Sequence, residues 1–227
     1  RENVLKRVLS IASKYNEDIM DFQILVPMKK KGELSTHNLN SKLQLIFNQD
    51  PEDVDEKDKI VRKISTILIG DKVIINGNNY DKNVFNGTMG IVEYIDSYGK
   101  GEIIIDFEGV GRITFTKEEM GQIDLGYAIS IHKSQGSQWK YVVLAFDYSS
   151  YVLLNRQLVY TGMTRAILAL FFVFEIKALE YAIMTDKSSD RNTFLVLLFN
   201  KDNDNLLEVY KTVLLKSLKG FNKDALF

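Results

Sequence analysis

Helical and extended hydrophobic patterns alternate in the first 60 residues of the chain. Residues 2–15 and 39–47 place apolar side chains on one face at helical spacing, so both segments predict amphipathic helices. Between them, residues 22–27 form a short apolar run that Pro27 ends, which is typical of a strand. A charge-dense stretch over 49–59 follows and predicts a solvated linker.

The pattern changes near Ile69 to short β-rich runs separated by turn signals. Residues 70–116 contain such signals at 76–77, 86–87, 98–101 and 108–111. The runs EIIIDF and RITFT are predicted as the two strands of one hairpin. Short strands at this spacing predict a small β-barrel of about SH3 size, inserted into an α/β domain.

Buried strands and helices alternate again after Gly121. We expect strands over 127–131, 141–147 and 168–176, and helices over 152–167 and 177–184. Continuous apolar strands joined by helices imply parallel pairing with a right-handed crossover. A last apolar stripe over 204–219 predicts a helix that Gly220 ends. The fold class is therefore α/β, with a parallel sheet flanked by helices and a small β insert.

The composition restricts the function classes open to this chain. With 227 residues, 45% of them hydrophobic and 26% charged, it suits a globular protein with a real core. Its net charge of −1 gives no overall basic field, so any contact with nucleic acid must come from a local patch. The absence of Cys excludes disulfides, thiol nucleophiles and Cys-ligated zinc, and two His do not suggest a metal site.

The chain shows no targeting or membrane signal. No apolar run reaches about 18 residues and no signal peptide is visible, so we expect a cytoplasmic protein with no membrane partner. The first residue is Arg1 rather than Met, which suggests that the chain was cut from something longer.

A cluster of polar residues interrupts the apolar run at 127–143. Alternation along a strand through 128–132 places Ser130 and His132 on the face opposite Ile129 and Ile131. In open α/β sheets, ligands bind beyond the carboxyl ends of strands. Gly136 would let a backbone amide approach such a ligand closely. The segment is either a ligand site or an ordinary polar turn, and the pattern leaves both interpretations open.

Two further segments carry possible phosphate ligands. Gly162 lies inside the predicted helix, where it costs ~1 kcal/mol relative to Ala, so we expect close packing there. Arg165 either caps carbonyls at the end of that helix or points its guanidinium at a phosphate. The Lys run at 29–31 either neutralises phosphates or is a solvated loop.

Together these segments resemble the C-terminal half of RecD-like superfamily 1 helicases, the exodeoxyribonuclease V alpha-like proteins of the 5′-to-3′ class. The resemblance covers residues 22–195 and is carried by VPMKKKG, NLNSKLQ, GDKVI, NNYDKNVFNGTMGIV, YAISIHKSQGSQW, VYTGMTRA and, more weakly, DRNTFL. It implies the second of two RecA-like domains, with an SH3-like insert. The implied divisions are 1–68 and 123–200 for the RecA-like domain, 69–122 for the insert, and 201–227 for a helical extension.

The resemblance also implies a role for each motif. The segment 127–138 is similar to motif V, which lies along single-stranded DNA and connects that contact to the nucleotide. The segment 159–166 is similar to motif VI, whose arginine reaches the γ-phosphate of ATP as an arginine finger. That contact also reports whether ATP is present, because hydrolysis removes it. Lys29 and Lys30 lie where motif IV is expected and would contact a phosphate of the nucleotide or of the DNA.

These implied roles give a set of candidate residues. Catalytic roles fall to Arg165 and Gln135. Nucleotide contacts fall to Gly136, Gln138, Arg165 and Lys29. DNA contacts fall to Ser130, His132, Lys133, Lys30, Asn79, Tyr80, Asn86 and Thr161. In the insert, Tyr80 or Phe85 could stack on bases, although Phe85 is alternatively part of the barrel core.

The sequence departs from the family pattern in two respects. Gln138 replaces a common Glu, so a contact to the ribose would lose its charge. No G-x-x-x-x-G-K-[ST] phosphate loop and no magnesium-holding Asp-Glu pair occur in these residues. ATP and Mg2+ would therefore be bound mainly through a first RecA-like domain that is absent here, and the fragment alone is expected to be inactive.

The expected function is that of a motor-domain fragment of an ATP-dependent DNA helicase. Its parent would translocate 5′ to 3′ on single-stranded DNA in recombination or repair, alongside other recombination-complex subunits. One alternative is a stand-alone nucleic-acid-binding module without ATPase activity. Another is the helicase half of a relaxase–helicase fusion, which shares these motifs.

Overall fold

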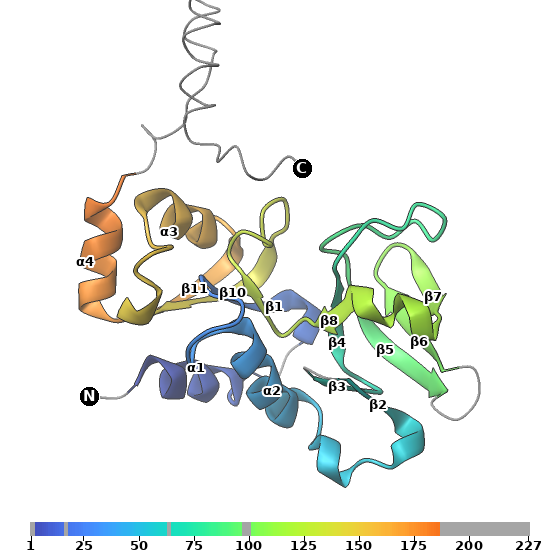
Figure 1. Cartoon of the computed structure of the whole chain (residues 1–227). Helices are drawn as coiled ribbons and strands as arrows, with labels where there is room; N and C mark the ends of the chain where they lie inside the picture. Colours follow the sequence, from blue (N-terminus) through green and yellow to red (C-terminus); the bar gives the residue numbers. More distant parts are fainter. Residues whose placement is uncertain (1–2, 16–17, 63–64, 97–100, 187–227) are drawn as a thin grey trace, which may run out of the picture. The chain divides into compact units, whose positions relative to one another are not determined.

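A parallel four-stranded sheet organises the α/β part of the chain (Figure 1). The computed structural model describes residues 3–15, 18–62, 65–96 and 101–186. The strand order is β11-β10-β1-β9, and every neighbouring pair is parallel, as the apolar strands predicted. The four strands are β1 (Phe22–Val26), β9 (Ala128–Ser130), β10 (Trp139–Phe146) and β11 (Ala166–Phe174).

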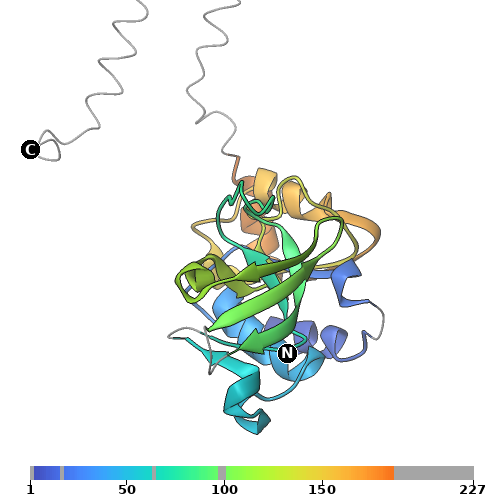
Figure 2. The same ribbon diagram turned by 90° about the vertical axis from the view of Figure 1, so that its right-hand side faces the viewer.

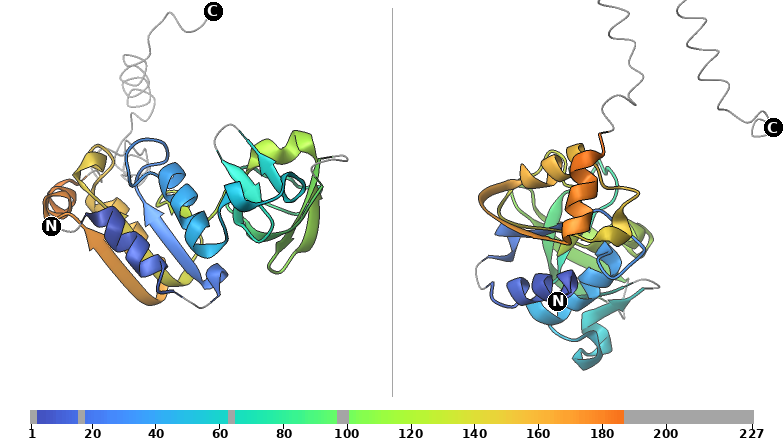
Figure 3. Two further views of the ribbon diagram at one scale, coloured as in Figure 1. Left: turned by 90° about the horizontal axis from the view of Figure 1, so that it is seen from below. Right: turned by 90° about the vertical axis from the view of Figure 1, so that its left-hand side faces the viewer.

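Alternation along the strands divides the core into two layers, one on each face of the sheet. Ile24 packs in one cluster with α1 (Val4–Ala12) and α2 (Thr36–Phe47). Its neighbour Leu25 packs in the other with α3 (Arg156–Met163) and α4 (Ile176–Met184). Figure 1 and the left view of Figure 3 show the blue helices α1 and α2 along one side of the strands. Helices on both faces explain why the strands are continuously apolar.

The insert is built on an antiparallel sheet of its own. Its order is β7-β6-β5-β4-β8, with a separate β2–β3 pair beside it. The predicted hairpin of EIIIDF and RITFT is confirmed as the β6–β7 pair. Figure 2 shows the green strands of this sheet from the insert side. The strands are β2 (Lys59–Val61), β3 (Thr66–Leu68), β4 (Lys72–Ile75), β5 (Met89–Asp96), β6 (Glu102–Phe107), β7 (Gly111–Phe115) and β8 (Ile123–Leu125).

The pairings of the described residues run from β7 to β8 without closing a ring. The insert has its own apolar core, in which Val73, Ile105 and Phe115 are fully buried. Strand β8 pairs with β4 inside this sheet, although it follows the predicted end of the insert at residue 122. The domain boundaries inferred from the sequence stay a prediction.

Short 3-10 turns connect these elements. The charge-dense segment 49–59 contains two of them, and a third caps the carboxyl end of β10. The turns are η1 (Ile19–Asp21), η2 (Pro51–Asp53), η3 (Glu56–Asp58), η4 (Lys117–Gln122) and η5 (Tyr148–Ser150).

Two predicted elements are shorter than expected. The helix predicted over 152–167 is wrong at both ends, because α3 starts after the Asn155 cap, whose side chain accepts from the Leu158 amide at 2.8 Å. Its far end is set by β11, since Ala166 already pairs with Trp139. The strand through 128–132 ends at Ser130, and a turn follows. The helix predicted over 204–219 and the DRNTFL segment at 190–195 lie outside the described residues.

A buried polar joint connects the insert to the α/β part. Lys72 is fully buried and donates to the carbonyl oxygens of Ile19 and Phe22 at 2.9 and 2.8 Å. Burial lowers the pKa of Lys72 to about 7. The neighbouring carboxylate of Asp71, whose pKa burial raises, accepts from Gln44, Asn48, Leu68 and Tyr127. Most partners of Lys72 and Asp71 belong to the α/β part of the chain, so these hydrogen bonds position the insert against the parallel sheet.

Candidate functional site

The predicted site residues fall into two groups at opposite ends of the parallel sheet. Strands β1 and β9 end together, with Val26 paired to Ser130. Strands β10 and β11 begin together, with Trp139 paired to Ala166. Since all four strands are parallel, residues that follow β1 and β9 lie at the carboxyl edge. Residues that precede β10 and β11 lie at the amino edge.

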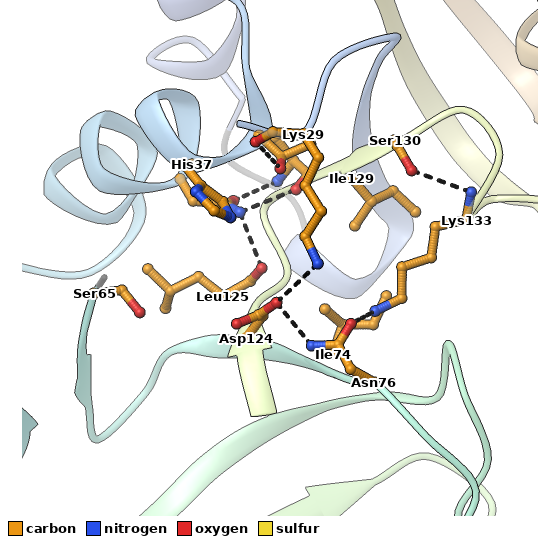
Figure 4. A pocket seen from close by; sticks show the side chains of 13 residues that line it. Lys29, His37, Ser65, Ile74, Asn76, Asp124, Leu125, Ile129, Ser130 and Lys133 are labelled. Carbon is orange, nitrogen blue, oxygen red and sulfur yellow. Dashed lines mark hydrogen bonds and ion pairs between the residues drawn. The ribbon is translucent and has the colours of Figure 1, made fainter. Parts of the chain in front are cut away.

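A pocket lies at the carboxyl edge and is walled by both parts of the chain (Figure 4). Its polar centre is Asp124, whose carboxylate lies 3.7 Å from the Lys29 ammonium and accepts from the Asn76 amide at 2.7 Å. Lys133 donates to the Asn76 side-chain oxygen. The pocket is lined by Lys29, Thr36, His37, Asn40, Ser65, Ile74, Asn76, Asp124, Leu125, Ala128, Ile129, Ser130 and Lys133.

Positive charge exceeds negative charge around this pocket. Arg62 approaches the second oxygen of Asp124 at 3.9 Å, so one carboxylate faces several cations. Burial lowers the pKa of Lys133 to about 8, with the charge of Asp124 opposing that shift and the charge of Lys29 adding to it. Burial also lowers the pKa of His37. Several cations that share one internal counter-ion suit a further anion.

The structure brings Lys29, Ser130 and Lys133 together at this pocket. The Ser130 hydroxyl accepts from the Lys133 amide at 3.3 Å, which fixes the turn after β9. His132 is exposed in that turn, and Lys30 is exposed in the loop after β1. The surface expected to face DNA is therefore assembled from the ends of two neighbouring strands.

Arg165 lies at the amino edge and is held by the chain itself. Its Nε donates to the Thr161 carbonyl at 3.1 Å, one Nη donates to the Ser137 carbonyl at 3.0 Å, and the other to the Thr164 hydroxyl at 3.0 Å. The contact with Thr161 confirms that Arg165 caps the end of α3. A guanidinium has five N–H donors, so these bonds leave one N–H on each terminal nitrogen.

Two more predicted residues belong to the amino-edge group. The Gln138 side chain is exposed and donates to the Thr164 carbonyl at 3.3 Å. Thr161, predicted as a DNA contact, lies in α3, and its hydroxyl donates to the Gln157 carbonyl at 2.8 Å. Its carbonyl accepts from Arg165, so Thr161 lies with the arginine rather than with the carboxyl-edge pocket.

The segment 131–138 joins the two edges. It turns back from the end of β9 to the start of β10, and Ser134 is fully buried within it, donating to the Ile131 carbonyl at 2.7 Å. Gly136 has a φ of +91°, a conformation that L residues with side chains rarely adopt. Gln135 and Gly136, expected to connect the DNA contact to the nucleotide, lie in this segment.

Gly162 supports the arginine through close packing, as its mid-helix position predicted. A Cβ on Gly162 would lie 2.7 Å from a methyl carbon of Leu144 in β10. A larger residue at this position would force Leu144 or α3 to shift, so the glycine lets the helix approach the sheet closely. The end of α3, and with it Arg165, is therefore set directly against β10.

The insert segment that resembles the helicase family exposes two aromatic rings. Tyr80 is 77% exposed and Phe85 is 44% exposed, with their ring centroids 5.9 Å apart, so the interpretation of Phe85 as barrel core is wrong. The neighbouring Val84 is the buried residue of this loop. Asn79 stabilises the loop through bonds to Glu119 and to the Lys82 amide. Asn86 is exposed.

Sequence analysis missed several residues of the carboxyl-edge pocket. Asn76 carries the signal of an Asn-Gly turn, but Asp124 has no local signal. Its partners Lys29 and Arg62 come from distant positions in the sequence. The sequence presents His37 only as one of two His, although its place at the start of α2 could have linked it to the preceding Lys run.

Neither a metal-ion cluster nor a membrane-spanning helix occurs within the described ranges. Among residues 3–15, 18–62, 65–96 and 101–186, His, Asp and Glu side chains form no group of three that could hold a metal ion. In the same part of the chain, no helix is long and apolar enough to cross a membrane.

Two family models match the chain. A UvrD-like helicase C-terminal domain matches residues 125–173, which include strands β9 and β10, most of β11, and Arg165. An ATP-dependent RecD-like DNA helicase SH3 domain matches residues 39–107. The second match supports an SH3-like identity for the insert.

Curated helicases are similar to this chain in sequence. The ATP-dependent RecD2 DNA helicase of Deinococcus radiodurans is 33% identical over 174 residues, which is 77% of this chain and 23% of that protein. The RecBCD enzyme subunit RecD of Mycobacterium tuberculosis is 32% identical over 97 residues, covering 43% of this chain and 16% of that protein. The chain thus spans less than a quarter of either relative.

A solved structure supports the fold. The Pif1 helicase from Bacteroides, in complex with ADP-AlF3 and single-stranded DNA, matches with a TM-score of 0.53 at 14% identity, over 83% of this chain and 52% of that one. The structural similarity supports a RecA-like fold, and because the identity is low it supports nothing finer. The motifs, both family models and the curated relatives agree, so the chain corresponds to the C-terminal region of a RecD-like superfamily 1 helicase.

Proposed function

We propose that this chain is the second motor domain, with its insert, of an ATP-dependent helicase that translocates 5′ to 3′ along single-stranded DNA. The proposal rests on one observation. A cationic pocket lies at one edge of the sheet, and an arginine with two unused N–H groups lies at the opposite edge. The segment 131–138 connects them. A motor needs a grip on its track, a sensor of the nucleotide and a link between the two.

The carboxyl-edge pocket would grip the DNA backbone. Lys29 and Lys133 supply charge for one or more phosphates, and the Ser130 hydroxyl is a further donor beside them. Such contacts do not depend on base sequence, which a translocating enzyme requires. Lys29 lies with Lys133 and Asp124 at the carboxyl edge, so we assign it to DNA rather than to the nucleotide.

The amino-edge arginine would contact ATP, the substrate. The two spare N–H groups of Arg165 suit two oxygens of a phosphoryl group, where they would stabilise negative charge as hydrolysis proceeds. Among the described residues, no group of three acidic or His side chains could hold Mg2+. Arg165 also donates to the Ser137 carbonyl, so a shift of its guanidinium is transmitted to 131–138.

The parent's setting follows from its relatives. One relative is an ATP-dependent DNA helicase and another is a subunit of the RecBCD enzyme. On this ground we propose a role in recombination or repair, with other recombination-complex subunits as partners.

Strand displacement by the full-length protein that carries this chain tests the proposal. We expect ATP-dependent unwinding of a duplex with a 5′ single-stranded tail, and ATP hydrolysis that single-stranded DNA stimulates. A duplex with a 3′ tail of the same length and sequence composition is the matched control. Unwinding of the 3′-tailed substrate alone, or hydrolysis indifferent to DNA, would contradict the proposed motor.

A stand-alone nucleic-acid-binding module is the second candidate. It is favoured by the fact that the cationic pocket is built from this chain alone. In that case, single-stranded DNA would bind with a strong salt dependence, and neither ATP nor the Arg165→Ala change would alter the affinity.

A further inference from the structure

A pair of exposed tyrosines lies at the carboxyl edge of the sheet, outside the pocket described above. Tyr148 and Tyr151 are 44% and 46% exposed, and their rings stack with centroids 5.6 Å apart at an angle of 17°. Tyr181 from α4 meets both rings edge-on, with centroids 6.0 Å away. The three rings therefore form one aromatic cluster that leaves part of the stacked pair open to solvent.

Local hydrogen bonds fix the stacked pair. Asp147 caps the turn η5 by accepting from the Ser149 amide at 3.0 Å. The Tyr148 amide donates to the Glu175 carboxylate at 3.0 Å, and the Tyr151 amide donates to the Tyr148 carbonyl at 3.2 Å. These bonds order the backbone that carries the rings, which reduces the conformational freedom that is lost when a ligand packs on them.

The strand order places the cluster beside the lysine loop. Leu25 pairs with Leu144, so the loop after β1 and the turn after β10 emerge next to each other. A Cβ on Gly32 would lie 3.5 Å from the Ser149 hydroxyl oxygen, which shows how closely the two segments approach. Since β1 lies between β9 and β10, the pocket, the lysine loop 29–31 and the tyrosines follow one another along the edge.

We propose that Tyr148 and Tyr151 are a stacking platform for the bases of single-stranded DNA that leaves the pocket along this edge. The inference rests on the proposed function and extends its DNA path across β10. Neighbouring strands are about 4.8 Å apart, so the platform begins about 10 Å from the end of β9. Aromatic rings next to a cationic track are the combination that binds single strands without reading their sequence.

The charges around the cluster set the orientation of the strand. Asp147 and Glu175 lie at the base of the tyrosines and repel phosphates. Lys30 and Lys31 are exposed on the other side, in the loop after β1. The backbone therefore runs over the lysines and the bases turn toward the rings.

Equilibrium binding of a fluorescent oligothymidylate to the full-length protein tests the platform. Tyr148→Ala and Tyr151→Ala should each weaken binding at least about fivefold, because stacking is worth ~1–3 kcal/mol per base. Tyr148→Phe and Tyr151→Phe keep the rings and should bind as the wild type does. Tyr94→Ala, which removes a 51%-exposed ring from β5 of the insert, is the matched control and should have no effect.

The salt dependence separates the platform from the pocket. Lys133→Ala should lower the salt slope by about 1, whereas the tyrosine variants should leave the slope unchanged. If Lys133→Ala weakens binding and both Tyr→Ala variants bind normally, the platform is overturned and the proposed function stands. If the wild type does not bind single strands at all, both fail.

Photocrosslinking gives a readout that does not depend on the folding of a variant. With 4-thiothymidine in the oligonucleotide, the wild-type protein should crosslink within residues 148–151. Crosslinks confined to other segments would overturn the platform even if the alanine variants bind poorly. Equal losses in the Phe and Ala variants would also overturn it, because they would indicate a role of the hydroxyls.

Discussion

The two edges of the sheet hold their functional side chains in different ways. At the carboxyl edge, Lys29 and Asp124 form an ion pair with side chains 54% and 34% exposed. At the amino edge, Arg165 is fixed by two backbone carbonyls and a hydroxyl. Exposed ion pairs are worth only about 0–1 kcal/mol, so a phosphate can replace the carboxylate at small cost. In the proposed function, the carboxyl edge would therefore bind DNA exchangeably, and the amino edge would present a preorganised arginine to the nucleotide.

The largest expected effect is on ATP hydrolysis when Arg165 is replaced. Arg165→Ala in the full-length protein should lower DNA-stimulated ATP hydrolysis by roughly 10³-fold or more, the range known for arginine fingers. Binding of single-stranded DNA should change little, because Arg165 lies at the other edge. Steady-state hydrolysis and oligonucleotide binding measure the two effects. Arg165→Lys keeps the charge but loses the fork of donors and should also be strongly impaired. Equal losses of hydrolysis and DNA binding would break the distinction between the edges.

The packing beneath the sensor should affect stability more than binding. Gly162→Ala places a methyl group against Leu144 and should destabilise the protein by roughly 1–3 kcal/mol, beyond the gain in helix propensity. Thermal or urea unfolding measures this change. Gly121→Ala is the matched control, because a Cβ there meets nothing within 4 Å. An unchanged or higher stability for Gly162→Ala would show that α3 can move away from β10.

The pH dependence of DNA binding tests the role of Lys133 in the carboxyl-edge pocket. Burial lowers the pKa of Lys133 to about 8, so its charge is present at pH 7 and is lost as the pH rises to 9. The affinity for single-stranded DNA should therefore fall several-fold over this window. Lys133→Arg stays charged throughout and should flatten the profile. Asp124, Lys29, His37 and Arg62 also face this pocket, so a fall that persists in Lys133→Arg would assign the titration to another group.

The smallest effect tests the internal counter-ion. Asp124→Asn keeps an acceptor for Asn76 but removes the negative charge among the cations, so binding of single strands should tighten by up to about fivefold. Titrations at low salt measure the change best, because screening weakens it. Glu52→Gln makes the same charge change in the exposed linker and serves as the control. Weaker binding by Asp124→Asn would show that the carboxylate orders the lysines rather than competing with DNA.

Local patterns predicted most of the fold. The unbroken apolar strands predicted a parallel sheet covered on both faces, and the β6–β7 hairpin followed from its turn signal. Gly162 predicted close packing because an uncompensated glycine in a helix is costly. The end of α3 was missed because pairing of Ala166 with Trp139 outweighs its helical pattern.

The site was predictable only where a motif is local. Ser130, Lys133 and Arg165 lie in short family-like phrases, and the structure places them at the two edges. Asp124 and Arg62 join the pocket through contacts between distant parts of the chain, which no local pattern contains. Our proposal that Lys29 contacts DNA rests on the strand order, which places it beside Lys133.

We propose that the segment 131–138 couples the two edges of the sheet. The most direct test is the affinity of the full-length protein for single-stranded DNA, measured with and without ADP–aluminium fluoride, in the wild type and in Arg165→Ala. We predict that the analogue shifts the wild-type affinity by at least about fivefold and leaves the Arg165→Ala affinity unshifted. The same shift in both proteins would contradict coupling through Arg165 and Ser137.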